Sequence, residues 1–91
     1  MLAEDTCGWW RVSALAVRAL ADGRPVDAAA IEGVAATLRN RTGELLWVLL
    51  AMDRGREGGR ALLADHRVDL TRYAWTVAVW PSLATRFAPL L

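Results

Sequence analysis

The residues most suggestive of chemistry are the three glycines and three arginines of DRGREGGR, residues 53–60. Successive backbone N–H groups at the start of a helix can bind phosphate, particularly beside a cation. Both common phosphate-binding patterns are incomplete here, because no Lys-Ser or Lys-Thr pair follows the glycines and no strand precedes them. The stretch instead predicts a helix end at Gly55 and a flexible turn that begins the next helix near Gly59.

Gly55-Arg56-Glu57-Gly58 also has the GXXG spacing of KH domains, in which a loop between two helices clamps a nucleic-acid backbone. Glu57 would face the phosphates with the wrong charge. The sequence also lacks the alternating strands from which a KH sheet is built. A simple turn between helices is the interpretation that these residues favour.

Catalytic and metal-binding residues are few. His66 and Cys7 are the single histidine and the single cysteine, and a zinc site needs three or four ligands at suitable spacing. A nucleophilic pair with His66 could be drawn through Cys7, Ser13 or Ser82, but no motif orients it. The sequence therefore predicts a protein that is not an enzyme and that has no metal and no cofactor.

The charge balance and the cysteine count limit the kind of partner. Eleven arginines and ten acidic residues give a net charge of +1, whereas nucleic-acid-binding domains usually carry a clear positive excess. One cysteine allows no internal disulfide, and the N-terminus lacks the basic region of a signal peptide. The longest charge-free stretch, residues 73–85, is too short to span a membrane. We expect a cytoplasmic protein without a membrane span.

Capping residues, glycines and prolines predict an all-α fold, a compact six-helix bundle in a single domain, residues 1–91. The expected helices begin after Thr6 or Asp5, after Asp27, after Thr42, near Gly59, after Asp69 and at Pro81. The last of them is expected to run through Phe87 and to end at Pro89. Residues 45–52, LLWVLLAM, are apolar on every side of a helix and should form the centre of the core.

Residues 73–80, YAWTVAVW, leave two interpretations open. Tyr73, Val77 and Trp80 share one face of a helix, but the odd-numbered residues 73–79 also alternate as in a strand. We favour the helix, because no second alternating run exists with which a strand could pair.

Five tryptophans are many for a chain of this length. Trp47 lies in the apolar stretch and is expected to be buried. Trp9 and Trp10 are adjacent, so on a helix they point about 100° apart. Both can be buried only if the first helix is nearly enclosed. We therefore expect one of them at the surface, where tryptophan is enriched among the hot spots of protein interfaces.

The charges of the expected helices fall into two groups. The first and fourth helices, with the turn that leads into the fourth, carry Arg11, Arg18, Arg54, Arg56 and Arg60. The second and third helices begin with Asp27, Glu32 and Glu44. A solvated surface of mixed charge explains these residues in the ordinary way. Alternatively, the basic group of one copy could meet the acidic group of the next in a head-to-tail interface.

Six short helices in about 90 residues resemble the death-fold superfamily, above all caspase-recruitment (CARD) and bacterial death-like domains. LLWVLLAMDRGREGGRALLADH is similar to the region where a leucine-rich third helix of that family ends in a basic, glycine-containing turn. The likeness covers roughly residues 25–66 and is carried by Ile31, Leu49, Leu50, Met52, Arg54 and Gly55.

The resemblance implies homotypic assembly, with a basic patch on helices one and four against an acidic patch on helices two and three. It would bring the arginines of one copy to the carboxylates of another, namely Arg11, Arg18, Arg56 and Arg60 to Asp27, Glu32 and Glu44. The expected function is that of a non-enzymatic adaptor or recruitment module whose partner is itself or a related helical domain. The alternative is a small nucleic-acid-binding regulator with a helix-turn-helix, although an all-apolar third helix offers nothing to base edges.

Overall fold

The computed structural model describes residues 8–38 and 40–91, and every regular element in these two ranges is helical. The α-helices are α1 (Trp9–Ala21), α2 (Ala28–Thr37), α3 (Arg41–Asp65), α4 (Trp75–Val79) and α5 (Ala84–Phe87). Three short 3₁₀ helices, η2 (Leu70–Tyr73), η3 (Pro81–Leu83) and η4 (Ala88–Leu90), complete the chain after α3. The predicted all-α class is confirmed. The predicted six-helix count is not, because two expected helices join in α3 and the last third divides into short turns.

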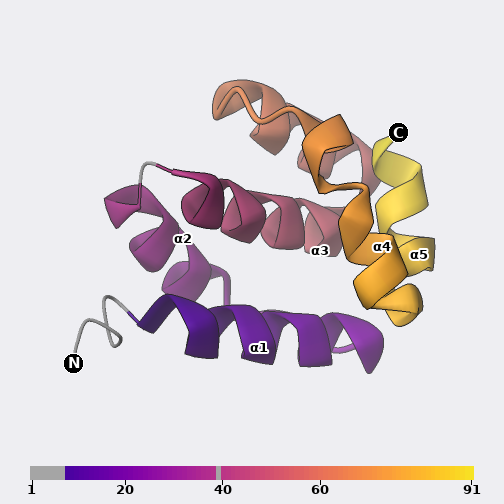
Figure 1. Ribbon diagram of the computed structural model, residues 1–91, viewed down its shortest axis with the longest axis horizontal. Coiled ribbons are helices and arrows are strands. Elements are labelled where there is room, and N and C mark those ends of the chain that lie inside the picture. Colours follow the sequence, from indigo (N-terminus) through magenta and orange to yellow (C-terminus); the bar gives the residue numbers. More distant parts are fainter. Residues whose placement is uncertain (1–7, 39) are drawn as a thin grey trace.

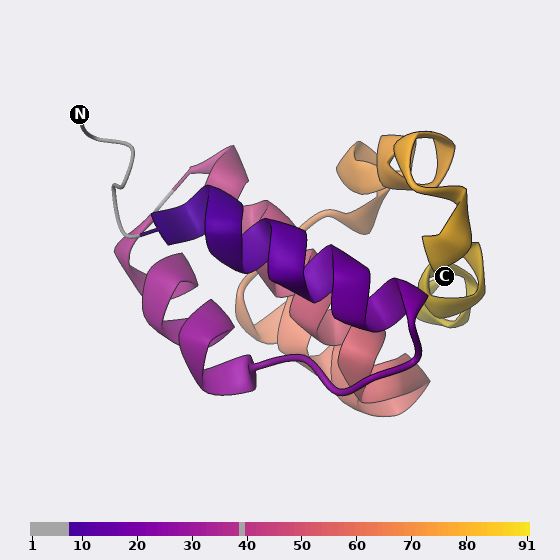
Figure 2. The same cartoon turned by 90° about the horizontal axis from the view of Figure 1, so that it is seen from below.

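The elements surround the first part of α3. In Figure 1 this part lies between α1 on one side and the segment after residue 60, drawn in orange, on the other. The short elements α4 and α5 stand together at one end of α3, which Figure 2 also shows from below. No helix in the described residues is long and apolar enough to cross a membrane.

The first two helices begin and end at residues of the expected kinds. The caps expected for α1, Thr6 and Asp5, lie outside the described residues. Gly23, just after α1, has the left-handed φ of 73° that glycine adopts most easily, and it ends this helix as predicted. Asp27 caps α2, because its carboxylate accepts a hydrogen bond of 3.1 Å from the Ala30 N–H.

The start of α3 differs from the prediction. The predicted cap, Thr42, is wrong: the side chain of Asn40 accepts hydrogen bonds from the N–H groups of Thr42 and Gly43, at 3.0 and 3.2 Å. Asparagine is among the strongest capping residues and here satisfies two of the unpaired N–H groups of the first turn. A side chain on Gly43 would clash with the Leu38 carbonyl group, so the end of α2 and the start of α3 are close together.

Gly55 divides α3 into two halves that fold against each other. Its φ of 85° and ψ of −174° lie in a region that is essentially restricted to glycine. The prediction of a helix end here is therefore correct, but the next half begins at once and not near Gly59. Gly59 lies against the Ala51 carbonyl, and the His66 ring stacks on Trp47, so contacts join residues on both sides of the break. We call this arrangement the α3 hairpin.

Residues 69–91 form a succession of short turns. Asp69 caps η2, as predicted, by accepting hydrogen bonds from the Thr71 hydroxyl and N–H at 2.6 and 3.0 Å, which lower the pKa of Asp69. The strand interpretation of residues 73–80 is wrong, because this segment contains the end of η2 and all of α4. Pro81 begins η3, as predicted. Helical backbone continues beyond Pro89 in η4, because proline fits the first turn of such a helix.

The core is centred on the first half of α3. The side chains of Leu46, Val48, Leu49 and Leu50 are fully buried. The prediction that residues 45–52 form the centre of the core is correct for most of them. Trp47 is an exception: it is only partly buried, because it lines a cleft at the molecular surface, where the exposed His66 ring covers one face of the indole.

Candidate functional site

The predicted basic and acidic groups are linked by an ion pair within the molecule. All five arginines are exposed, but Arg54 forms an ion pair of 2.9 Å with Glu32 in the same molecule. Arg56 and Arg60 line a shallow hollow together with Glu57. Arg18 lies 4.0 Å from the Asp22 carboxylate along α1. In the Arg54–Glu32 pair, a residue of the predicted basic group thus contacts a residue of the predicted acidic group within one chain.

Each residue of the predicted acidic patch already has a partner inside the molecule. Asp27 caps α2, and Glu32 is paired with Arg54. The Tyr73 hydroxyl donates a hydrogen bond of 2.6 Å to the Glu44 carboxylate. Burial, and then this hydrogen bond to Glu44, raise the pKa of Tyr73 well above its usual value. These contacts leave the carboxylates less available to a second copy of the chain.

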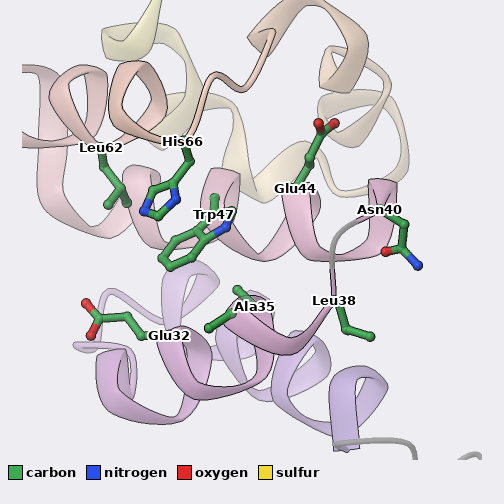
Figure 3. A pocket seen from close by; sticks show the side chains of 9 residues that line it. Glu32, Ala35, Leu38, Asn40, Glu44, Trp47, Leu62 and His66 are labelled. Carbon is green, nitrogen blue, oxygen red and sulfur yellow. The ribbon is translucent and has the colours of Figure 1, made fainter.

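A cleft of about 680 Å³ lies between α2 and the α3 hairpin. Figure 3 shows the rings of Trp47 and His66 face to face at its centre, with Glu32 on the side of α2. The ring centroids are 3.7 Å apart and the planes differ by 12°. The described residues contain no group of three histidine, cysteine or acidic side chains that could hold a metal ion. The stack ties together the two halves of the hairpin, which is a structural role.

A second cleft, of about 600 Å³, is lined almost entirely by apolar side chains of α1, the start of α3 and α4. We call it the tryptophan groove, because four of the five tryptophans line it. Its walls are formed by Trp9, Trp10, Ser13, Ala14, Val17, Arg18, Ala21, Leu45, Trp75 and Trp80. Only Ser13 and Arg18 among these residues have polar side chains apart from the indole N–H groups.

Two of these tryptophans are strongly exposed. Trp10 is 56% exposed and Trp75 is 47% exposed, whereas Trp9 is partly buried. The Trp75 and Trp80 rings lie 6.0 Å apart and are tilted by 43°. An exposed cluster of large aromatic side chains is costly in water and typically marks an interaction surface. Of the pair singled out in the sequence, Trp10 is the residue at the surface.

The position of Trp75 depends on the turn formed by residues 73–80. Thr76 is fully buried, and its hydroxyl donates a hydrogen bond of 2.7 Å to the Tyr73 carbonyl. The Trp80 N–H donates to the Thr76 carbonyl, also at 2.7 Å. These bonds fix α4 with Trp75 and Trp80 facing α1. The sequence did not reveal the groove, because local spacing does not indicate how residues 73–80 pack against α1.

A smaller hollow, of about 320 Å³, adjoins the groove and shares Trp9, Leu45 and Trp75 with it. Arg41 and Arg72 line this hollow, and we call it the arginine hollow. Arg72 lies 3.9 Å from the Asp69 carboxylate, and both side chains are more than half exposed. Such exposed pairs contribute little, so these arginines remain able to bind another anion.

Comparison of the chain with protein-family models, with curated proteins and with solved structures found no match. The resemblance of residues 25–66 to the death-fold superfamily therefore stays a prediction. Function is inferred below from the tryptophan groove and the charges around it.

Proposed function

We propose that this protein is a non-enzymatic interaction module that binds a helical segment of another protein in the tryptophan groove. The observation that carries the proposal is the gathering of four tryptophans around one open apolar cleft. Tryptophan is the residue most enriched at the energetic centres of protein interfaces. Grooves of this kind accept the apolar face of an amphipathic helix, with anchors spaced three or four residues apart.

The predicted homotypic association through charged patches has less support than the groove. Asp27, Glu32 and Glu44 are all engaged within the molecule, and Arg54 is paired with Glu32. The helix-turn-helix alternative also has little support. A recognition helix must expose polar side chains to base edges, whereas the first half of α3 is the buried centre of the fold.

The test uses a synthetic amphipathic helical peptide with leucines at positions i, i+3, i+4 and i+7 as the probe. Trp10→Ala and Trp75→Ala should each weaken binding by roughly thirtyfold, the effect of removing an interface hot spot worth about 2 kcal/mol. Leu15→Ala is the matched control, because Leu15 is 61% exposed on the same helix but lines a different hollow. Titration calorimetry measures the three affinities.

Two results would contradict this function. One is that the peptide does not bind the parent protein at all. The other is that Leu15→Ala weakens binding as much as the tryptophan variants do. Sedimentation at increasing protein concentration tests whether a second copy of the chain occupies the groove. Dimers that Trp10→Ala abolishes would identify this groove as a homotypic interface, in place of a site for another protein.

A further inference from the structure

We infer that the segment bound in the tryptophan groove is an acidic amphipathic helix. Its apolar face contacts the tryptophans, and acidic side chains at its two ends contact the arginines at the two ends of the groove. This inference rests on the function proposed above. It adds the chemistry by which the partner is recognised.

The length of the groove suits a helix of several turns. Its lining residues on α1 recur at helical spacing from Trp9 to Ala21, which are the first and last residues of that helix. At 1.5 Å per residue, the 13 residues of α1 extend roughly 20 Å. A partner helix lying along α1 would therefore contact this surface over about three to four turns.

Arginines stand at both ends of this surface. Arg18 lines the groove toward the C-terminal end of α1, and the arginine hollow with Arg41 and Arg72 adjoins it beside Trp9. Among residues 8–38 and 40–91, none of those that line the groove or the arginine hollow is acidic. Three carboxylates in the described part of the chain already have partners: Asp22 lies by Arg18, Asp69 by Arg72, and Glu44 accepts from Tyr73. The local charge therefore favours a partner with acidic ends.

The polar groups that line this surface are chiefly hydrogen-bond donors. Indole N–H and guanidinium groups donate and cannot accept. Within the described ranges, none of the four indoles of the groove makes a hydrogen bond. Carboxylates and carbonyl groups are the complementary acceptors, and carboxylates make the stronger bonds to guanidinium.

Ser13 is a second indication that the groove receives a ligand. This residue lines the groove, is only 8% exposed, and its hydroxyl has no hydrogen-bond partner among the residues that the structure describes. Buried polar groups are nearly always paired, so an unpaired one requires an explanation. Because the hydroxyl oxygen is closed off from solvent, a polar group of the bound helix would satisfy it once the surrounding side chains shift on binding.

The charge preference is tested with two probe peptides that share the same leucine positions and differ only in carrying glutamates or lysines at both ends. The Glu-flanked peptide should bind at least roughly tenfold more tightly, and added salt should narrow the difference. The double variant Arg41→Gln/Arg72→Gln should reduce that preference. Arg60→Gln, an exposed arginine in a different hollow, should leave it unchanged.

The outcomes separate this inference from the proposed function. If both peptides bind equally and Trp10→Ala abolishes binding, the groove is a docking site but the acidic preference is wrong. If neither binds, the proposed function itself fails. Tighter binding of oligothymidylate than of the Glu-flanked peptide would overturn the inference in favour of single-stranded nucleic acid, which also combines arginines with aromatic stacking.

Ser13→Ala tests the buried hydroxyl separately. It should weaken binding of the Glu-flanked peptide several-fold while leaving the melting temperature of the free protein unchanged or raised, since an unpaired buried hydroxyl does not stabilise the free protein. Loss of stability together with loss of binding would mean that Ser13 is a packing residue, and unchanged binding would remove it from the site.

Discussion

Tyr73 joins parts of the chain that are far apart in sequence. Its side chain is almost fully buried, and its hydroxyl donates to Glu44 and lies 3.3 Å from the Arg41 carbonyl oxygen. These contacts fix the start of α3 against η2, and η2 leads directly into α4 with Trp75. A buried hydroxyl thus positions one wall of the tryptophan groove.

The raised pKa of Tyr73 predicts a specific loss of stability at alkaline pH. In the unfolded chain this tyrosine ionises near its ordinary value of 10.0, whereas burial and Glu44 keep it neutral in the folded protein. Its contribution is therefore complete below pH 10 and is lost as the pH rises above that value. In Tyr73→Phe, the free energy of unfolding measured with denaturant should therefore fall less steeply between about pH 9 and pH 11 than in the parent protein. If the free energy of unfolding of Tyr73→Phe fell as steeply as that of the parent protein, other titrating groups would be the cause of the alkaline loss of stability.

The residues that form the groove illustrate what the sequence could predict at this scale. The adjacent Trp9 and Trp10 have directions set by helix geometry alone, so an exposed tryptophan could be expected there. Trp75 could not be placed in the same way, because its direction depends on how a short turn packs against α1. The exposed side of Trp10 was therefore predictable, while the cluster of four tryptophans was not.

At the scale of the elements, the α3 hairpin shows both a successful and a failed prediction. Gly55 was expected to end a helix, and its backbone conformation does so. The next helix was expected to begin only near Gly59, because glycine has a low intrinsic helix propensity. That expectation was wrong, because tertiary packing overrides the low propensity here. Gly59 is required for that packing, since it lies directly against the Ala51 carbonyl and the Leu90 side chain.

Gly55 and Gly58 form a matched pair for testing the hairpin. Gly55→Ala should destabilise the protein by about 1–3 kcal/mol, because alanine is strained at a φ of 85°. Gly58 is exposed, has no positive φ, and a Cβ there would meet only the Arg54 side chain at 3.4 Å. Gly58→Ala should therefore stabilise the helix by about 0.8–1 kcal/mol. Urea unfolding measures both, and equal effects of the two substitutions would argue against the strained turn.

At the scale of the whole molecule, the C-terminal turns close the core. Leu90 in η4 is buried, and its side chain occupies the space that a Cβ on Gly59 would need. The next residue, Leu91, is 69% exposed. The end of the described chain is thus packed against the second half of the α3 hairpin. Two adjacent leucines there have opposite environments, since Leu90 is buried and Leu91 is exposed.

Leu90→Ala should cost about 2–5 kcal/mol of folding free energy, the usual range for a buried leucine. Leu91→Ala should change it by less than about 0.5 kcal/mol, since exposed positions contribute little. Thermal unfolding followed by circular dichroism provides both values. If Leu91→Ala were as damaging as Leu90→Ala, the last turn would not be packed as described.

The fold class could be predicted from local signals, but the arrangement of charges could not. Caps such as Asp27 and the stop at Gly23 depend on neighbouring residues, and both agree with the structure. The expected separation into a basic and an acidic side required knowing which helices adjoin. The ion pair between Arg54 and Glu32 joins the end of one half of α3 to α2, a contact between the two groups that local signals do not indicate.

The α3 hairpin has a consequence for the order in which the chain folds. Its two halves are contiguous in sequence, so their contacts close a short loop and are expected to form early. The tryptophan groove instead unites α1 with residues 75–80, which are separated from α1 in the sequence by all of α2 and α3, and should form late. Amide hydrogen exchange should accordingly protect the hairpin more strongly than α4. A helix bound between α1 and α4 would then slow exchange in the part of the molecule that opens most readily.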